Sequence, residues 1–274
     1  MTGMDDVARR GLVLLGCGRM GGAMLNGWLK GGLPPAAVWV LDPAAGPALA
    51  DRGVRVNAGL PEDPAVCVLA VKPQIMEQAL PAVTALGGGG TLVLSIAAGV
   101  TLGRLGAAFG PGTPIVRAMP NTPAAIGQGI SALIGNAEAG ERGLALAETL
   151  LAVIGETVRL TEEGQMDAVT AVSGSGPAYV FHMIECLARA GEAEGLPGPL
   201  ALRLAVATVA GAGALAARTG RDPAELRAEV TSPGGTTAAG LAHLMDAETG
   251  LCPLIGRTVA AAAERSRELG RAAG

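Results

Sequence analysis

The chain is 274 residues long, half of them hydrophobic but only 2% aromatic, and it carries a net charge of −4. That length is enough for one or two domains with a proper hydrophobic core. The slight acidic balance, without a basic cluster, argues against nucleic acid or an anionic membrane as the main partner. Four dispersed cysteines and two histidines show no metal-binding spacing. We therefore expect reduced thiols, a cytoplasmic location and no bound metal.

The first regular pattern is an apolar strand at residues 11–16, after a polar and acidic N-terminus that does not resemble a signal peptide. The strand runs into Gly16-Cys17-Gly18-Arg19-Met20-Gly21, and a helical pattern follows over residues 19–31. This is G-x-G-x-x-G between a strand and a helix, the context that a dinucleotide fingerprint requires. The first glycine makes the tight turn, the second admits a pyrophosphate, and the third lets the helix pack on the strand.

The second strand, expected at residues 37–42, supplies the other half of this fingerprint. It ends in Asp42, 21 residues after Gly21. An acid there accepts hydrogen bonds from the ribose hydroxyls of the adenosine. A glycine-rich chain produces a lone G-x-G-x-x-G by chance, but the two halves together predict dinucleotide binding. Asp42 would repel the 2′-phosphate of NADP and Arg19 would offset that repulsion, so the choice between NADH and NADPH stays open.

Strand-like and helical patterns continue to alternate up to about residue 160. Such alternation with short connections predicts a mostly parallel, doubly wound sheet, although the strands after Pro120 need not be parallel. We therefore expect an α/β, Rossmann-like domain at residues 1–162. The remaining strands are expected at residues 65–71, 91–96, 113–118, 129–134 and 154–160, and the remaining helices at 45–52, 75–85, 101–108 and 138–152.

From residue 163 to 274 the pattern is helical throughout, which predicts an all-α domain. Four prolines stand where helices are expected to restart: Pro177, Pro199, Pro223 and Pro253. These helices are apolar on more than one face and must be buried on several sides. A helical domain of this size cannot bury all of that surface alone, so we expect an intimate homo-oligomer. The longest apolar stretch, residues 204–217, is too short and alanine-rich to span a bilayer.

A glycine-rich turn between two helical patterns is the most informative segment of the second half. It reads Thr231-Ser232-Pro233-Gly234-Gly235-Thr236-Thr237, and a helix is expected from Thr236 to about Met245. Adjacent glycines let backbone amides approach a ligand without a Cβ in the way. A helix N-terminus presents unpaired N–H groups and a partial positive charge, which suits a small carboxylate or phosphate. The alternative is a plain helix–helix turn with a threonine cap.

Six segments, in order and spacing, make the chain resemble the pyrroline-5-carboxylate reductase family from Gly11 to about Arg267. The first is the G-x-G-x-x-G segment, which many dehydrogenases share, and the last is VTSPGGTT at residues 230–237, which is close to diagnostic. Between them lie AVKPQ at 70–74, SIAAGV at 95–100, RAMPNTP at 117–123 and SGSGPAY at 173–179.

The resemblance implies a Rossmann domain followed by an interlocked helical dimerisation domain. It also implies dimers, five of which often assemble into a ring. It implies reduction of 1-pyrroline-5-carboxylate to L-proline with NADPH or NADH, the last step of proline biosynthesis, in an active site that borrows from the partner subunit. Some similar enzymes carry an asparagine near position 60, where this chain has Leu60. The implied substrate contacts are Ser232, Gly234, Gly235, Thr236 and Thr237, with the carboxylate on the amides of Gly235 and Thr236. The implied cofactor contacts are Gly16, Gly18, Arg19, Met20, Gly21, Asp42, Ala70, Lys72, Pro73, Ala97 and Asn121.

Thr237 is the candidate catalytic residue, as a proton donor or as a group that orients the ring nitrogen; the alternative is a threonine that bonds only to backbone. Reducing a cyclic imine needs little from the protein beyond positioning and electrostatics, because the cofactor carries the hard step. For Lys72 the alternative to a cofactor contact is a solvated loop lysine. For Asn121 the alternative is a turn residue. Ser232 either caps the turn or touches substrate.

Two other kinds of function fit parts of the sequence. One is a reductase of a related cyclic imine, or a β-hydroxyacid dehydrogenase with a similar two-domain plan. The latter usually uses a lysine of the second domain as general acid, and this chain has no lysine after Lys72. The other is a dinucleotide-binding protein without catalytic activity, against which the Gly-Gly-Thr-Thr turn argues.

Overall fold

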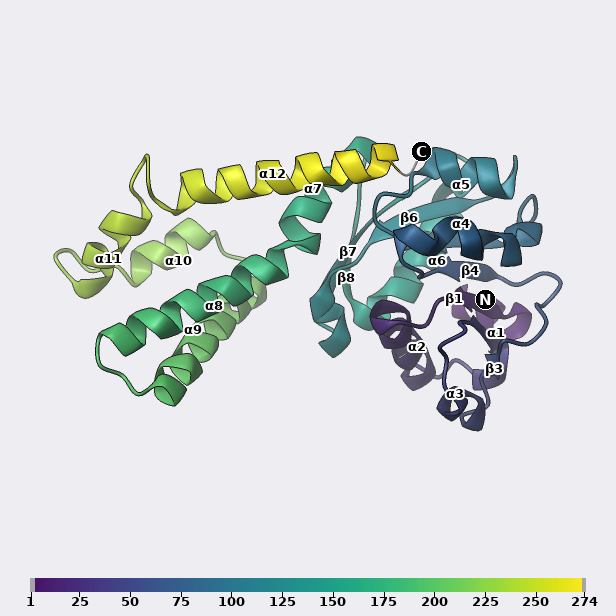
Figure 1. Ribbon diagram of the computed structural model, residues 1–274, viewed down its shortest axis with the longest axis horizontal. Helices are drawn as coiled ribbons and strands as arrows, with labels where there is room; N and C mark the ends of the chain where they lie inside the picture. Colours follow the sequence, from purple (N-terminus) through teal and green to yellow (C-terminus); the bar gives the residue numbers. More distant parts are fainter. Residues whose placement is uncertain (1–2, 273–274) are drawn as a thin grey trace. The chain divides into compact units, whose positions relative to one another are not determined.

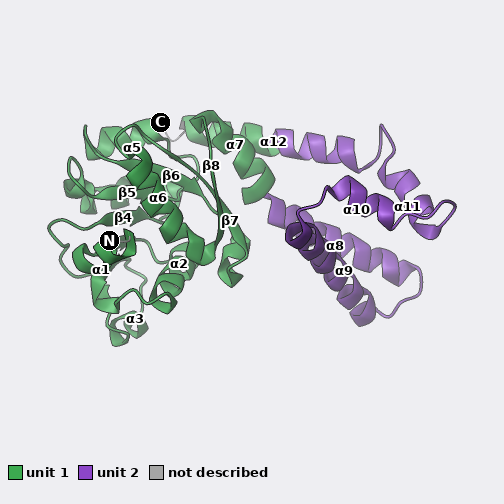
Figure 2. Ribbon diagram, turned by 180° about the vertical axis from the view of Figure 1, so that it is seen from behind, with its two compact units in different colours: residues 1–174, 262–274 green, residues 175–261 purple. Residues whose placement is uncertain are grey.

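The structure, a computed structural model, describes residues 3–272. Its elements are labelled in Figure 1. The described residues form two compact units, coloured separately in Figure 2. The α/β unit comprises residues 3–174 together with 262–272, and the helical unit comprises residues 175–261. The last helix therefore begins in the helical unit and ends in the α/β unit.

One sheet organises the α/β unit, in the strand order β3-β2-β1-β4-β5-β6-β7-β8. The pairs from β3 to β6 are parallel, β7 is antiparallel to β6, and β8 is parallel to β7. This confirms the doubly wound fold and the departure from parallel order after Pro120. The strand order reverses between β1 and β4, where such sheets bind their ligands at the carboxyl ends of the strands. The strands are β1 (Leu12–Leu15), β2 (Val38–Leu41), β3 (Arg55–Val56), β4 (Val66–Leu69), β5 (Leu92–Ser95), β6 (Ile115–Met119), β7 (Gly129–Gly135) and β8 (Gly155–Arg159).

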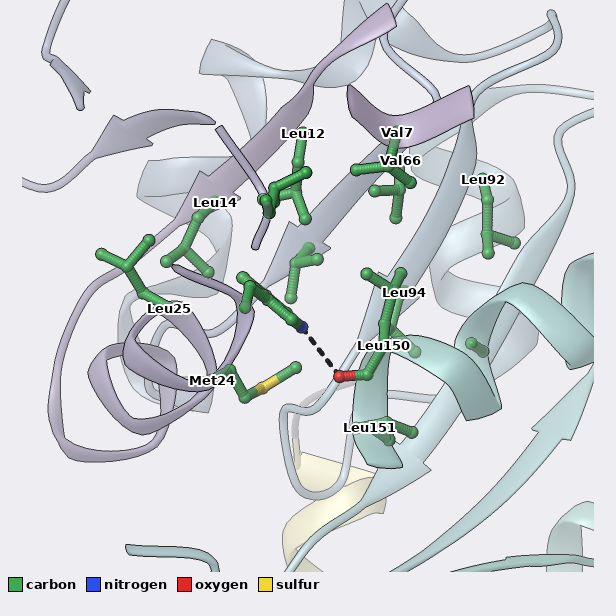
Figure 3. Packing of buried hydrophobic residues seen from close by; sticks show 14 of the residues in the cluster. Val7, Leu12, Leu14, Met24, Leu25, Val66, Leu92, Leu94, Leu150 and Leu151 are labelled. Atoms are coloured by element: carbon green, nitrogen blue, oxygen red, sulfur yellow. Dashed lines mark hydrogen bonds between the residues drawn. The ribbon is translucent and has the colours of Figure 1, made fainter. Parts of the chain in front are cut away.

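Helices cover both faces of the sheet, so the central strands are buried on both sides, as parallel strands require. One face packs against α1, α2 and α6 through Val7, Met24, Leu25 and Leu150 (Figure 3). The Leu150 carbonyl there accepts a hydrogen bond from Trp28 Nε1 at 2.8 Å. The other face packs against α4 and α5. The helices of this unit are α1 (Gly3–Arg10), α2 (Arg19–Lys30), α3 (Pro47–Asp51), α4 (Met76–Ala79), α5 (Leu102–Phe109), α6 (Gly140–Leu151) and α7 (Met166–Val169).

Three local features differ from the sequence-based expectation. Helix α1 lies in the segment that was interpreted only as polar. The short strand β3 was not expected, and its Arg55 stacks over the Trp39 ring at 4.4 Å from the centroid. The helix expected at 75–85 is divided into α4 and short 3₁₀ turns. Pro81 explains part of that division, because proline lacks the N–H that a continuing helix needs.

The helical unit is built on a hairpin of α8 (Gly176–Ala193) and α9 (Gly198–Thr219), followed by α10 (Pro223–Glu229), α11 (Thr236–Leu244) and α12 (Leu251–Ala272). Small residues let the two hairpin helices approach closely. A Cβ added at Gly191 would lie 3.3 Å from Ala201 Cβ. In front of α8, residues Thr170–Gly174 form a π-helical segment, and Pro177 stands in the first turn of α8 as expected.

The helices of this unit expose much apolar surface in the single chain. Helix α9 has 22 residues and a mean hydropathy of 1.8 over its most apolar part, of which only 11% is buried. The expectation that this stretch is too short to span a bilayer is therefore wrong on length. Length and composition alone are a weak indication of a membrane span, because helices of soluble assemblies share them. The exposed large apolar side chains on α8 and α9 are Val180, Phe181, Met183, Leu187, Leu200, Leu202, Leu204, Val206 and Leu215.

Candidate functional site

The turn between β1 and α2 has the backbone that a pyrophosphate site needs. Gly16 adopts φ +91°, and a Cβ there would lie 2.9 Å from the backbone nitrogen of Val71. A Cβ on Gly21 would lie only 2.4 Å from the Gly16 carbonyl oxygen, whereas one on Gly18 would meet nothing within 4 Å. Gly16 and Gly21 are thus required for packing, and Gly18 faces open space. The residues present fit a dinucleotide.

The N-terminus of α2 offers donors to an anion in that space. Gly18 is the N-cap, and the first amide with an acceptor in this helix is that of Gly22, which donates to Gly18 O at 2.8 Å. The amides of Arg19, Met20 and Gly21 precede it and have no acceptor within the helix. Together with the helix dipole they favour a phosphate. The Arg19 side chain is exposed beside them.

Asp42 is built into this turn. One carboxylate oxygen, Oδ2, accepts from the Cys17 amide at 2.7 Å, and the other, Oδ1, accepts from the Ala44 amide at 2.8 Å. The side chain therefore ties the end of β2 to the glycine-rich turn. A carboxylate has about four lone-pair positions, so each oxygen keeps one for a further donor such as a ribose hydroxyl.

Asn57 is a residue of this region that sequence reasoning missed. Its amide nitrogen Nδ2 donates to Asp42 O at 3.0 Å, and its Oδ1 accepts from the Asp42 amide, also at 3.0 Å. It holds φ +49°, a left-handed conformation that asparagine tolerates better than most residues. Leu60, which stands where an asparagine was sought, instead packs against the apolar cluster. The sequence did offer a signal for this residue, because Asn57 stands only three residues before position 60, near which an asparagine was sought.

The Asp42 carboxylate also acts on the Cys17 thiol of the same turn. Burial raises the pKa of the Cys17 thiol, and the Asp42 carboxylate raises it further, while Arg52 acts in the opposite direction. The thiol is therefore protonated at neutral pH and is no nucleophile.

The loops after β4 and β5 lie at the same edge of the sheet, because parallel strands end together. The Ala70 amide donates to Leu15 O at 2.8 Å, which places Ala70 beside the fingerprint turn. Lys72 follows as an exposed residue and Pro73 is half-buried. Ala97, two residues after β5, is buried. These four expected cofactor residues are thus brought together with the glycine turn.

Asn121 follows β6 at this edge, and its side chain already has two partners. Its Oδ1 accepts from the Ile130 amide at 3.0 Å, and its Nδ2 donates to Ser173 Oγ at 3.2 Å. Asn121 therefore links β7 and the π-helical segment Thr170–Gly174. Single-turn π segments are frequent at functional sites.

The turn before α11 lies in the helical unit and has the form expected of an anion site. Gly234 holds φ +69°, where a side chain would be strained. Gly235 is the N-cap of α11, and a Cβ on it would lie 2.5 Å from Ser232 Oγ. Gly234 is therefore needed for the backbone to take this path, and a side chain at Gly235 would have to displace the Ser232 hydroxyl.

The amides that this turn leaves for a ligand are those of the first turn of α11. The Gly235 amide donates to Ser232 O at 3.0 Å, and the Ala239 amide donates to Gly235 O at 3.1 Å. The amides of Thr236, Thr237 and the residue after them have no acceptor within the helix. Thr237 is half-buried and Thr236 is exposed. This arrangement can bind a carboxylate and present a hydroxyl next to it.

Comparison with known proteins identifies the families that the two parts of the chain resemble. Residues 163–269 match the family described as pyrroline-5-carboxylate reductase dimerisation, and residues 11–99 match the family described as NADP oxidoreductase coenzyme F420-dependent. Pyrroline-5-carboxylate reductase of Pseudomonas aeruginosa is 39% identical over 94% of this chain and 96% of its own length. The enzyme of the same name from Methanosarcina acetivorans is 38% identical over 94% and 97%.

Solved structures show the same likeness. A pyrroline-5-carboxylate reductase from Coxiella burnetii superposes with a TM-score of 0.87 at 32% identity, over 95% of this chain and 98% of that one. Pyrroline carboxylate reductase from Plasmodium falciparum, solved with NADP bound, superposes with a TM-score of 0.81 at 28% identity, over the same shares. On the identity, the coverage and the matched dimerisation domain, the chain belongs to the pyrroline-5-carboxylate reductase family.

Proposed function

We propose that this chain reduces 1-pyrroline-5-carboxylate to L-proline with NADPH or NADH, the last step of proline biosynthesis. The observation that carries the proposal is the occurrence in one chain of two glycine-rich turns that each lead into a helix N-terminus. The α2 turn opens at Gly18 and suits a pyrophosphate. The α11 turn, in which the Gly235 amide donates to Ser232 O, leaves the amides of the first helical turn for a small carboxylate.

The chemistry assigned to the chain's own residues is binding, orientation and proton placement. The dinucleotide, when bound, supplies the hydride. Reduction of the imine adds that hydride to the ring carbon and one proton to the ring nitrogen. We assign the substrate carboxylate to the amides of Thr236 and Thr237, because the Gly235 amide has Ser232 O as its acceptor. The Thr237 hydroxyl then donates to, or orients, the ring nitrogen.

The dinucleotide contacts proposed for the α/β unit fall into two groups by role. The pyrophosphate is bound by the amides of Arg19, Met20 and Gly21, in the turn that Gly16 and Gly18 form. The adenosine ribose is bound by Asp42. The loop residues Ala70, Lys72, Pro73, Ala97 and Asn121 line the ribose and nicotinamide. For Asn121 this contact would come from its backbone or from a second lone pair on Oδ1, since its side chain already links Ile130 and Ser173.

We further propose a homodimer that associates into a decamer, in the cytoplasm, without nucleic acid or membrane as partner. The exposed apolar helices of the helical unit support association. The proposed domain boundary is 1–162 and 163–274, which the start of the dimerisation match at residue 163 supports. Residues 163–174 nevertheless cluster with the α/β unit in the structure.

The decisive experiment is a spectrophotometric assay of the purified full chain with 1-pyrroline-5-carboxylate and each reduced nucleotide, with L-proline identified as product. A six-membered cyclic imine carboxylate and a β-hydroxyacid with oxidised nucleotide serve as competing substrates. Preference for the six-membered imine by kcat/KM would favour the related imine reductase. Nucleotide binding without turnover of any substrate would favour the protein without catalytic activity.

A further inference from the structure

Glu163 stands at the junction of two loops at the cofactor edge of the sheet. Its Oε1 atom accepts two hydrogen bonds, from the Leu102 amide at 2.8 Å and from Arg117 Nη1 at 2.9 Å. These partners are 61 and 46 residues away in sequence. All three residues belong to the α/β unit.

Each partner lies next to one of the loops, Leu102 at the end of the loop after β5 and Arg117 in the strand before the loop after β6. Leu102 is the first residue of α5, so its amide has no acceptor in the helix and fixes where the loop after β5 ends. That loop begins at Ser95 and contains Ala97. Arg117 lies inside β6, whose end leads to Asn121. One carboxylate oxygen thus joins the end of the loop after β5 to β6, the strand that leads to Asn121.

The burial of the pair gives the contact its strength. The Arg117 side chain is 7% exposed and Glu163 31% exposed. Arg117 also lines a cavity of about 350 Å³ with Gly99 and Thr101 of the loop after β5. A buried guanidinium needs a paired carboxylate, and hydrogen bonds between charged groups are about twice as strong as neutral ones. The loop after β5 is therefore held from the side of residue 163 as well as by its own strand.

We propose that Glu163 is a positioning residue for dinucleotide binding, which acts by holding the loops after β5 and β6 at a fixed separation. The proposal rests on the cofactor role assigned above to Ala97 and Asn121. It adds a residue that no fingerprint of dinucleotide binding contains. The same contact has a purely structural alternative, in which Glu163 only neutralises Arg117.

The test compares Glu163→Ala, Glu163→Gln and the control Glu148→Ala in the full chain. Glu148 lies on α6 and pairs with Arg159 of β8 at 2.7 Å, an ion pair of the same unit that contacts neither loop. We expect Glu163→Ala to raise the dissociation constant and the KM of the nucleotide about tenfold, the effect of about 1.4 kcal/mol, with the KM of the imine changed less than twofold. Glu163→Gln, which keeps an acceptor oxygen, should restore at least half of the loss. Glu148→Ala, which also removes an ion pair of the α/β unit, should leave nucleotide binding unchanged.

A double variant, Glu163→Ala with Arg117→Met, separates positioning from charge neutralisation, because it removes the buried charge together with its partner. Positioning predicts that the double variant regains stability but still binds nucleotide weakly, since the Leu102 amide has lost its acceptor. Normal nucleotide affinity in the double variant or in Glu163→Ala would overturn the proposal while leaving the proposed function intact. Failure of the wild-type chain to bind either nucleotide would instead overturn the proposed function, and this inference with it.

Discussion

Gly235 is a position in the helical unit where a side chain has little room. A Cβ there would lie 2.5 Å from Ser232 Oγ, while a Cβ at Gly240 in the same helix meets nothing within 4 Å. We expect Gly235→Val to abolish imine reduction and to spare nucleotide binding, because the branched side chain displaces the turn that presents the α11 amides. Gly240→Ala is the control and should keep both. Near wild-type kcat/KM in Gly235→Val, with normal nucleotide binding, would place the carboxylate elsewhere.

Thr237 follows two residues later and is half-buried at the first turn of α11. We expect Thr237→Ala to lower kcat/KM by about 10- to 1000-fold, or roughly 1.4–4 kcal/mol of transition-state stabilisation. The larger loss fits a proton donor and the smaller one a hydroxyl that only orients the ring. Thr237→Ser, which keeps the hydroxyl, should recover most of the activity. Unchanged kinetics across the pH range in Thr237→Ala would reduce Thr237 to part of a helix terminus.

Asp42 is expected to set the nucleotide preference. The wild-type chain should discriminate weakly against NADH or prefer it, because the carboxylate proposed to bind the ribose would repel a 2′-phosphate by on the order of a kcal/mol. The two amides that Asp42 holds complicate a simple substitution, since Asp42→Ser replaces two carboxylate oxygens with one shorter hydroxyl and should weaken both nucleotides. Asp42→Asn keeps one acceptor and removes the charge.

The comparison for Asp42 is therefore kcat/KM with NADH and NADPH in the wild type and in both variants. The ratio should move toward NADPH in each variant, several-fold in Asp42→Asn, where the turn is better preserved. The exposed Arg19 opposes the effect by attracting the same phosphate. A strong wild-type preference for NADPH that neither variant alters would mean that Asp42 serves the turn alone.

Among the elements, α6 and β8 are joined by an ion-pair network centred on Arg159. Its guanidinium bonds to Glu148 at 2.7 and 2.8 Å and also to Glu141. The hydrogen bond from Arg159 lowers the pKa of Glu148 below its usual 4.5. A carboxyl whose pKa is lower folded than unfolded stabilises the fold above the unfolded value, and this contribution is lost as the pH falls through the folded value.

The expected result is that Glu148→Gln costs about 0.5–1 kcal/mol of unfolding free energy at neutral pH, a modest amount because the pair is partly exposed. The difference from wild type should shrink as the pH falls below about 4.5. Denaturant unfolding at a series of pH values measures it. A difference that stays constant down to the acid limit would show that the charge of Glu148 contributes nothing.

The elements themselves could be predicted wherever a periodic pattern or a proline marks them. Seven strands and the order of the helices were predicted within a few residues, and β1 followed by Gly16 fixed the fingerprint turn. The two residues of β3 are too few for a pattern, and they pair only because Trp39 and Val40 lie beside them. Asn57 and Glu163 escaped prediction for a related reason, since each acts on residues distant in sequence. The site-residue roles remain predictions.

At the scale of the whole molecule, the apolar surface of the helical unit needs a partner. Helix α9 is 22 residues long and largely unburied in the single chain, and Phe181 on α8 is 60% exposed. Surface of this kind and extent marks an interface rather than a monomer's exterior. The match to the dimerisation family spans both helices, so we expect a second copy of the chain to cover that surface.

We therefore expect size-exclusion chromatography with light scattering to give at least twice the chain mass of 27.0 kDa, independent of dilution in the micromolar range. Phe181→Glu places a charge in the exposed apolar surface and should shift the population toward smaller species, with imine reduction falling in parallel. The fall should exceed any change in nucleotide binding, because the fingerprint turn lies in the α/β unit. A stable wild-type monomer with full activity would contradict the homodimer, and the apolar faces of α8 and α9 would then need a different occupant.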